Sequence, residues 1–233
     1  MSSRTLVITP LQSEFVFLSQ AISELGFYSL SEKIGSVDVL TFPKLELTLA
    51  RGGHGKTEYA IHTMYLVDRT SLDLVICAGA AGSLSPSISI GDIIAATSTV
   101  EHDYHEKFSE RPKPQFFGDE QSIEQLRSIR FKEKLFKLHF GIIASGDEDI
   151  IEHHRAEELH RLYGAIAVAW EGAGGARACA FNKKPYLELR GVTDSADQSA
   201  ASNFEENLEL AMQNIATVLV EACHAKPERP VPT

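Results

Sequence analysis

The sequence predicts a single α/β domain whose central, mixed β-sheet is flanked by helices. Along the 233 residues, short apolar or β-branched segments of strand length alternate with segments whose apolar residues recur every three or four positions. Several strand-like segments are apolar at consecutive positions, as strands covered by helices on both faces require. No internal repeat divides the chain, and 43% apolar residues suffice for one packed core. We therefore expect one domain over residues 1–224 and a flexible tail over 225–233.

The first 79 residues contain one predicted helix among four predicted strands. The helix follows the first strand, because Phe15, Leu18, Ile22 and Leu25 recur at helical spacing. This order of elements favours a largely parallel or mixed sheet. The predicted strands are LVIT at 6–9, VDVLTF at 37–42, LELTLA at 45–50 and LVICAG at 74–79.

The second half continues the alternation and contains the irregular segments. Residues 104–122, with two prolines, many charges and two adjacent aromatics, are predicted to form a surface loop before a helix. The tail AKPERPVPT has three prolines in nine residues, which predicts an extended or disordered segment. The predicted strands are GDIIAATS at 91–98, FGIIAS at 140–145, AIAVA at 165–169 and YLELRGVT at 186–193, and the last helix carries Leu208, Met212, Ile215 and Leu219 on one face.

Composition argues against several classes of protein. The formal net charge of −10 disfavours a nucleic-acid partner, because phosphate backbones are bound by clustered Lys and Arg. The densest basic segment, residues 127–137, alternates charged and apolar residues, which on a helix gives a solvated face and a buried stripe. No segment approaches the roughly 20 apolar residues of a membrane span, and no signal peptide is evident, so we expect a cytoplasmic protein. Cys77, Cys179 and Cys223 lie in apolar contexts without C-x-x-C spacing, so we expect buried thiols rather than a catalytic cysteine.

Four predicted strands end in residues that could bind a ligand, which in an open α/β sheet lies beyond the carboxyl ends of the strands. Each also has a structural interpretation: Glu14 suits the first turn of a helix, glycine turns after strands are common, and Asp194 could cap a helix. Glu171 is harder to explain, because the alanines and glycines around it leave its charge to a distant residue or a ligand. The four features are Glu14, the turn with Gly79 and Gly82, Glu171, and Asp194 with Asp197.

Three carboxylates at strand ends suggest that the protein cleaves a glycosidic bond. One carboxyl group can act as the acid, a second as the base, and a third can accept hydrogen bonds from vicinal hydroxyl groups. The residue types alone do not separate O-glycosides from N-glycosides.

Four blocks of the sequence, in this order, resemble the 5′-methylthioadenosine/S-adenosylhomocysteine nucleosidases of the purine nucleoside phosphorylase superfamily. The blocks are ITPLQSE, AGAAGSLSPSISIGDIIAAT, SGDEDI and AIAVAWEGAGGARACAFNKKPYLELRGVTDSAD, and the similarity spans residues 6–220. The resemblance implies a nucleoside phosphorylase-like fold, a homodimer, and hydrolysis of a purine nucleoside to free base and a ribose derivative. We expect no cofactor and no metal.

The resemblance also implies a role for each matching residue. Glu14 stands where the family's carboxylate activates the attacking water, and Asp194 stands where the general acid protonates N7 of the leaving purine. Glu171 matches the glutamate that binds the ribose 2′- and 3′-hydroxyls, and Trp170 replaces the usual methionine under the ribose. This division requires a protonated Asp194 with a raised pKa and an ionised Glu14. The other expected substrate-binding residues are Ala80, Ala81 and Gly82 beside the sugar and water, and Asp149, Ile150 and Thr193.

Two positions depart from the family pattern. E-M-E-[AG] reads A-W-E-G here, so Ala169 lacks the first glutamate, and S-G-D-x-F-I reads S-G-D-E-D-I, so Asp149 replaces a phenylalanine that stacks on adenine. A carboxylate removes the stacking surface and offers an acceptor, which would suit a base with an N–H at N1, such as hypoxanthine or guanine. Alternatively, the loop is shifted and Asp149 points to solvent.

The sequence does not define the 5′ side of the substrate. His102, Asp103 and His105 lie where family members are apolar, so they contact a polar 5′ group or are ordinary surface residues; a metal site from H-D-Y-H lacks further ligands. A polar-tailed nucleoside, as in the futalosine hydrolases, is one alternative substrate. Three further histidines have no spacing that forces a role and are expected at the surface or in loops: His54, His153 and His154.

Two rival functions share this fold. A phosphorylase would need converging cations or a nest of donors for phosphate, yet Arg51 is the one arginine near a predicted strand end in the first half, and Glu14 would repel phosphate. A nucleoside-binding protein without activity is suggested by Ala169 and Asp149. Binding alone, however, would not need an acid such as Asp194 at the leaving base.

Overall fold

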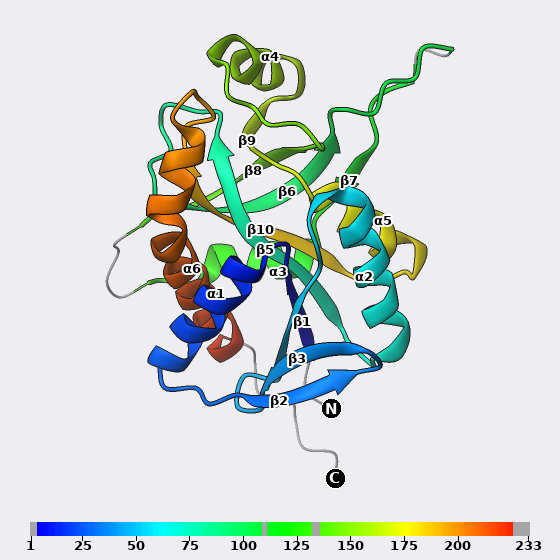
Figure 1. Ribbon diagram of the computed structural model, residues 1–233, viewed down its shortest axis with the longest axis vertical. Coiled ribbons are helices and arrows are strands. Elements are labelled where there is room, and N and C mark those ends of the chain that lie inside the picture. The colour runs from blue at the N-terminus through cyan, green and yellow to red at the C-terminus, as the bar shows by residue number, and fades with distance from the viewer. Residues whose placement is uncertain (1–3, 109–110, 132–135, 226–233) are drawn as a thin grey trace.

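The structure, a computed structural model, describes residues 4–108, 111–131 and 136–225, which form one α/β domain with a mixed sheet (Figure 1). This architecture confirms the predicted fold class. The tail predicted over 225–233 lies, from residue 226 on, outside the described residues. The strands are β1 (Thr5–Thr9), β2 (Leu30–Ile34), β3 (Val37–Phe42), β4 (Leu47–Arg51), β5 (Leu74–Ser83), β6 (Ile93–Glu101), β7 (Gln115–Phe117), β8 (Leu138–Ser145), β9 (Ala165–Ala169) and β10 (Tyr186–Asp194). The helices are α1 (Gln12–Glu24), α2 (Gly55–Arg69), α3 (Glu120–Ser128), α4 (His153–Tyr163), α5 (Gly172–Phe181) and α6 (Ala200–His224).

The sheet consists of a closed ring of strands with an open extension. Its order is β10-β6-β8-β9-β5-β1-β4-β3-β2, and β10 also pairs with β5, so β5, β9, β8, β6 and β10 close on themselves. The extension runs outward from β5, where β1 lies between β4 and β5 and is parallel to both. Near the site, Gly82 pairs with both Val168 and Asp194, and Ser145 pairs with Ala169. The ends of four ring strands therefore meet at one place.

The core has two layers because side chains alternate between the faces of the central strands. Val7, Ile76 and Leu187 pack on the side covered by α1 and α6, whereas their neighbours Leu6 and Val75 pack on the side of α2 and α5 (Figure 1). On α6, all four apolar residues predicted to share a face are buried: Leu208, Met212, Ile215 and Leu219. The predicted first helix is also confirmed, although it ends at Glu24 and leaves Leu25 exposed.

Small residues let two helices approach the rest of the domain closely. A Cβ added at Gly191 of β10 would lie 2.8 Å from the Cβ of Ala211 on α6, and one added at Gly174 of α5 would overlap the Lys56 carbonyl oxygen on α2. The glycines of the A-W-E-G-A-G-G segment thus allow α5 to pack directly against the start of α2.

Two local predictions were wrong. The segment 104–122 is not loop throughout, because β7 pairs antiparallel with β6 and α3 begins at Glu120. The basic segment 127–137 does not form one helix: α3 ends at Ser128, the described residues that follow it before β8 are not helical, and 132–135 lie outside the described residues.

Candidate active site

A pocket of about 430 Å³ lies where the ends of β1, β5, β9 and β10 meet. All the residues expected from the sequence to take part in catalysis or substrate binding line it: Glu14, Ala80, Ala81, Gly82, Asp149, Ile150, Trp170, Glu171, Thr193 and Asp194. The structure thus brings together residues from opposite ends of the chain. Their individual roles stay predictions, because no bound ligand places them around a substrate.

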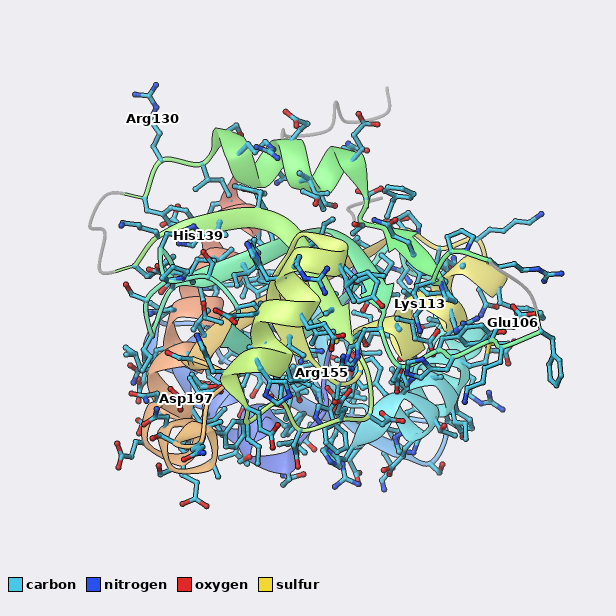
Figure 2. The ribbon with its side chains drawn as sticks, turned by 90° about the horizontal axis from the view of Figure 1, so that it is seen from above. Glu106, Lys113, Arg130, His139, Arg155 and Asp197 are labelled. Atoms are coloured by element: carbon cyan, nitrogen blue, oxygen red, sulfur yellow. The ribbon has the colours of Figure 1, made fainter. Side chains whose placement is uncertain are left out.

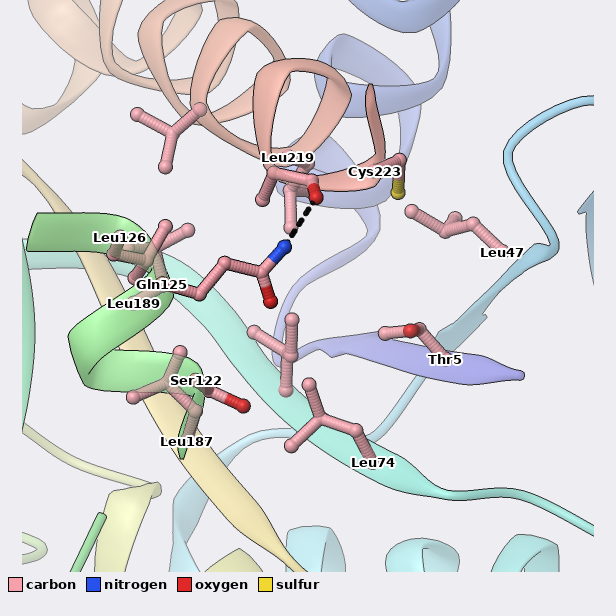
Figure 3. A pocket seen from close by; sticks show the side chains of 13 residues that line it. Thr5, Leu47, Leu74, Ser122, Gln125, Leu126, Leu187, Leu189, Leu219 and Cys223 are labelled. Atoms are coloured by element: carbon pink, nitrogen blue, oxygen red, sulfur yellow. Dashed lines mark hydrogen bonds between the residues drawn. The ribbon is translucent and has the colours of Figure 1, made fainter. Parts of the chain in front are cut away.

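A second, smaller cavity lies between α3, α6 and the sheet (Figure 3). Its volume is about 40 Å³, and its lining is mostly apolar, with Gln125 donating from Nε2 to the Ala222 carbonyl oxygen at 2.7 Å. This cavity is too small for a nucleoside, and carboxylates are missing from its described lining. The larger pocket is therefore the candidate active site.

Glu14 is buried at the start of α1 with both carboxylate oxygens occupied. Its Oε2 accepts from the Leu11 N–H at 2.8 Å, as a glutamate in the first turn of a helix can, and its Oε1 accepts from the Ala80 N–H on β5 at 2.8 Å. Burial, and then the negative charge of Glu171, raise the pKa of Glu14 from 4.5 to about 7, against the opposing effect of these N–H groups and Arg190. A carboxyl group with this pKa can exchange a proton with water near neutral pH.

Asp194 is the last residue of β10 and faces Gly82. Its Oδ1 accepts from the Ala196 N–H at 2.9 Å, and its Oδ2 accepts from the Thr193 hydroxyl at 2.8 Å. A Cβ at Gly82 would lie 2.7 Å from Oδ1, so only glycine leaves this space open. Burial raises the pKa of Asp194 above 3.8, although both hydrogen bonds favour the ionised form. The alternative that Asp194 caps a helix is wrong, because α6 begins at Ala200 with Ser199 as its N-cap.

Glu171 is paired by residues that are distant in the sequence, as its isolated charge required. Its Oε1 accepts from the Gly55 N–H at 3.3 Å and lies 3.5 Å from Nδ1 of His54, and its Oε2 accepts from Nη2 of Arg190 at 3.4 Å. The side chain is only 5% exposed. It is the N-cap residue of α5, and the Gly174 and Gly175 N–H groups donate to its backbone carbonyl oxygen rather than to its carboxylate.

Arg190 is the main functional residue that the sequence reasoning missed. It lies fully inside the domain, donates from Nε to Oε1 of Glu188 at 2.8 Å, and donates from Nη1 to the Ala80 carbonyl oxygen at 3.2 Å. Glu188 is also buried and accepts from the Thr99 hydroxyl at 2.5 Å. The signal was present in YLELRGV: opposite charges two residues apart share one face of an otherwise apolar strand.

Trp170 and His54 stack on each other at the pocket wall. Their ring centroids lie 4.4 Å apart at an interplanar angle of 25°. His54 was expected to be an uninvolved surface or loop residue; it does belong to a loop, at the N-cap of α2, but it lines the pocket. The sequence offers little signal for this, because the contact joins the ends of β4 and β9, which are far apart in the chain. His153 and His154 are exposed at the start of α4, as expected.

The loop after β8 forms the rim of the pocket. Ile150 is buried, whereas Asp149 is exposed to solvent at the rim. The neighbouring Glu148 is held by Arg155, whose Nε and Nη2 donate to its two oxygens at 2.9 and 2.8 Å. Arg155 belongs to α4 and is labelled in Figure 2. Asp149 is thus both solvent-exposed and next to the pocket, so the two alternatives for it were not exclusive.

The segment EHDYHEKF does not line the pocket. Asp103 accepts from Nζ of Lys56 at 2.5 Å, and Glu101 accepts from the same Nζ at 2.9 Å, which ties the start of α2 to the end of β6. His105 is exposed, and His102, expected at a 5′ group or at the surface, is instead 1% exposed. No three His, Cys, Asp or Glu side chains among the described residues are arranged to hold a metal ion.

Comparisons with known proteins agree with this geometry. Residues 4–224 match the sequence profile of the phosphorylase superfamily. The chain is 28% identical over 209 residues to a 5′-methylthioadenosine/S-adenosylhomocysteine nucleosidase of Tolumonas auensis, covering 82% of this chain and 91% of that one. It is also 28% identical to the aminodeoxyfutalosine nucleosidase of Campylobacter jejuni, covering 76% and 80%. Its fold is similar to the 5′-methylthioadenosine/S-adenosylhomocysteine nucleosidase of Neisseria meningitidis in complex with methylthio-immucillin-A, with a TM-score of 0.83, 25% identity, and 95% and 98% of the two chains covered. No described helix is both long and apolar enough to cross a membrane.

Proposed function

The chain belongs to the phosphorylase superfamily, and from this premise we propose that it is a nucleosidase, which hydrolyses the N-glycosidic bond of a purine nucleoside. The observation that carries the proposal is one pocket with three buried carboxyl groups in different environments. Glu14 and Asp194 have raised pKa values, and Glu171 is paired with a buried arginine. Such a set supplies a base, an acid and a group for sugar hydroxyls.

The division of roles follows from the charge that develops during cleavage. When the bond to the base breaks, positive charge forms on the sugar and negative charge on the base. A protonated Asp194 at the end of β10 donates its proton to the leaving base. An ionised Glu14, held between the Leu11 and Ala80 N–H groups, accepts a proton from the attacking water. The two groups come from β10 and from the start of α1, so they can act on opposite sides of the sugar.

Glu171 is suited to bind the ribose hydroxyls. Its oxygens make only long contacts within the protein, at 3.3 to 3.5 Å, so they keep capacity for shorter hydrogen bonds from a ligand. Arg190 balances part of its charge and, through the Ala80 carbonyl oxygen, fixes the strand that carries the donor to Glu14. Sugar binding and water activation are thereby linked through one side chain.

Water is a better nucleophile for this pocket than phosphate. The described lining includes six carboxylates and one arginine, and that arginine is engaged by Glu171 and Glu188. Arg51, considered as a phosphate ligand, is exposed and does not line the pocket. The phosphorylase alternative therefore lacks the free cations that it needs.

Among purine nucleosides, the family relationship supports a substrate of the methylthioadenosine/S-adenosylhomocysteine type or a related 5′-modified nucleoside, and it leaves the preferred 5′ group to the pocket. The relatives are named for such substrates, and the futalosine type represents the alternative with a polar 5′ substituent. Asp149 at the rim offers an acceptor where an aromatic side chain would stack, which supports a base carrying an N–H donor.

The deciding experiment measures release of free base from a panel of nucleosides, with and without phosphate. The panel is methylthioadenosine, adenosine, inosine, guanosine and futalosine. We expect release that does not depend on phosphate, and a loss of about a hundredfold or more in kcat for Asp194→Asn, because the amide cannot donate the acidic proton. Asp38→Asn is the matched control, since Asp38 is an exposed carboxylate on β3 and lies outside the pocket lining.

Two results would reject this function, and a third would reject the role of Asp194. If no nucleoside releases base, the protein binds without catalysis; if turnover requires phosphate, it is a phosphorylase. Unchanged cleavage by Asp194→Asn would remove this residue from the mechanism.

We further propose a homodimer located in the cytoplasm. The family resemblance suggests the dimer, and exposed apolar side chains on adjacent elements support it: Ile61 on α2, Phe117 on β7 and Phe181 on α5 (Figure 1). The buried, unbridged thiols of Cys77 and Cys179 fit a reducing compartment. Sedimentation velocity and cell fractionation test these two proposals.

A further inference from the structure

We propose, on the basis of the nucleosidase function above, that His54 recognises the 5′ end of the nucleoside and selects a substituent that donates a hydrogen bond, such as a hydroxyl, over a thioalkyl group. The proposal concerns the side of the substrate that the sequence left undefined. EHDYHEKF lies outside the pocket lining of its own chain, whereas His54 lines that pocket.

The order of strands places His54 at the 5′ end of the substrate. Asp194 is on β10 and Asp149 follows β8, both on the ring, whereas His54 follows β4 on the open extension, beyond β1. Glu171 lies between them and contacts His54. In a nucleoside, the 2′- and 3′-hydroxyls lie between the base on C1′ and the 5′ carbon on C4′. With the base at Asp194 and these hydroxyls on Glu171, the 5′ substituent is directed toward His54.

The imidazole ring of His54 is held in one orientation by two contacts. One face stacks on Trp170, with centroids 4.4 Å apart, and Nδ1 lies 3.5 Å from Oε1 of Glu171. Because a carboxylate only accepts hydrogen bonds, this contact favours the proton on Nδ1 and leaves the lone pair of the neutral ring on Nε2. No described residue hydrogen bonds to Nε2, and the side chain is 56% exposed. Nε2 is therefore an oriented acceptor at the pocket wall.

The pocket wall around His54 favours a 5′ substituent that donates a hydrogen bond and disfavours an anionic one. A 5′-hydroxyl can donate to Nε2, whereas a thioether has no N–H or O–H to donate. A 5′-phosphate or carboxylate would enter a pocket whose lining includes Glu148, Asp149 and Glu205 in addition to Glu14, Glu171 and Asp194. Repulsion from these groups opposes binding of an anion.

Three variants of His54 separate substrate recognition from support of Glu171. In His54→Gln the side-chain amide reaches the position of Nε2, whereas in His54→Asn it reaches only the position of Nδ1 and can still contact Glu171. His54→Leu keeps the volume and removes both polar atoms. Since the residue is half-exposed, with φ −89° and ψ 137°, ordinary residues fit its backbone. The midpoint of thermal unfolding checks that each variant is folded.

The measurement is kcat/KM for nucleoside pairs that share a base and differ only at C5′, such as adenosine and methylthioadenosine. We expect the wild-type protein to prefer the 5′-hydroxyl substrate. His54→Asn and His54→Leu should each lower that preference about tenfold, as loss of one hydrogen bond predicts, and His54→Gln should keep it within about threefold.

The possible results test the role of His54 separately from the nucleosidase function. Base release with a wild-type preference for the methylthio substrate or for a nucleoside 5′-monophosphate would overturn the role of His54 and leave the nucleosidase function standing. Losses that are equal for both substrates of a pair, and that occur in His54→Leu and His54→Gln but not in His54→Asn, would reduce His54 to a support for Glu171. No base release from any nucleoside would remove both proposals.

Discussion

Glu14 is the residue at which burial bears most directly on activity. A carboxylate that accepts two backbone N–H bonds would ordinarily be a weak base, because these bonds stabilise its ionised form. Here burial and the neighbouring charge of Glu171 outweigh them and bring its pKa to about 7. The fold thus turns an ordinary first-turn glutamate into a base suited to neutral pH.

The pH dependence of kcat/KM follows from this value. Below pH 7 Glu14 gains a proton and cannot accept one from water, so we expect the ratio of kcat/KM for the wild type to kcat/KM for Glu14→Gln to fall about tenfold for each unit below pH 7. The ratio isolates Glu14, because loss of the proton from Asp194, whose pKa is also raised, lowers the activity of both proteins alike as the pH increases. Steady-state assays of both proteins from pH 5 to 9 measure the ratio. A ratio that is flat between pH 5 and 7 would contradict the assignment of Glu14 as the base.

Arg190 connects the buried charges of the site, and its removal should cost stability as well as activity. Arg190→Met leaves Glu171 and Glu188 buried without their cation, so we expect a loss of about 3–5 kcal/mol in the free energy of unfolding. Arg69→Met is the control, because Arg69 forms an exposed pair with Asp68, worth at most about 1 kcal/mol. Urea denaturation monitored by fluorescence measures both variants. A loss below that of the control would mean that Arg190 does not neutralise the two glutamates.

The sequence allowed the carboxylates of the site to be predicted, but not their partners. Glu14, Glu171 and Asp194 each follow a recognisable strand, and strand ends are where such folds bind ligands. The contacts of His54 and Arg190 depend on how β4, β9 and β10 are ordered in the sheet, which the local pattern does not determine. Residue type and position in an element were therefore predictable, whereas pairing across the sheet was not.

At the scale of elements, α5 positions Glu171 through its close contact with α2. Gly174 faces the Lys56 carbonyl oxygen, and the neighbouring Gly55 N–H donates to Glu171. The distance between the two helices is thus part of the geometry of the sugar site.

A methyl group at this contact should disturb both stability and binding. Gly174→Ala places its Cβ against backbone of α2, which cannot move freely, so we expect a loss of about 1–3 kcal/mol in the free energy of unfolding and a raised KM. Ala180→Leu, on the exposed part of the same helix, should change stability by no more than about 0.5 kcal/mol. Thermal unfolding and base-release assays give both quantities. Equal stability of the two variants would show that the helices have room to separate.

The strands that the sequence did not predict are those at the edges of the sheet, and helices α2, α4 and α5 were not predicted individually. β2 reads LSEKI and is largely exposed, with only Leu30 and Ile34 apolar, so its strand character comes mainly from pairing with β3. β7 is three residues long and exists by pairing with β6. The buried strands, in contrast, are recognisable from their own runs of apolar and β-branched residues. All eight were predicted within a few residues of their observed bounds.

At the scale of the whole molecule, the alternation of strands and helices was sufficient to predict the class of fold, but not the closure of the ring. That closure depends on β10 pairing with both β5 and β6, one parallel and one antiparallel, which no periodicity encodes. The two helical layers, in contrast, follow from the strands that are apolar on both faces. The apolar residues of each strand thus indicate that helices cover both faces of the sheet, whereas the order of the strands depends on pairing between segments that are distant in the sequence.

The closed ring also divides the pocket into two parts that can change independently. Asp194 ends the ring strand β10 and Glu171 follows the ring strand β9, both hydrogen-bonded on two sides, whereas Glu14 and His54 follow β1 and β4. A register shift in a ring strand would have to be matched by all of its neighbours, but the side chain at position 54 can change while the backbone N–H of Gly55 still donates to Glu171. A change at position 54 can therefore alter the preferred substrate without moving Asp194. Selection or engineering could adapt such an enzyme to new 5′ substituents through a single loop, while the residues that cleave the N-glycosidic bond stay the same.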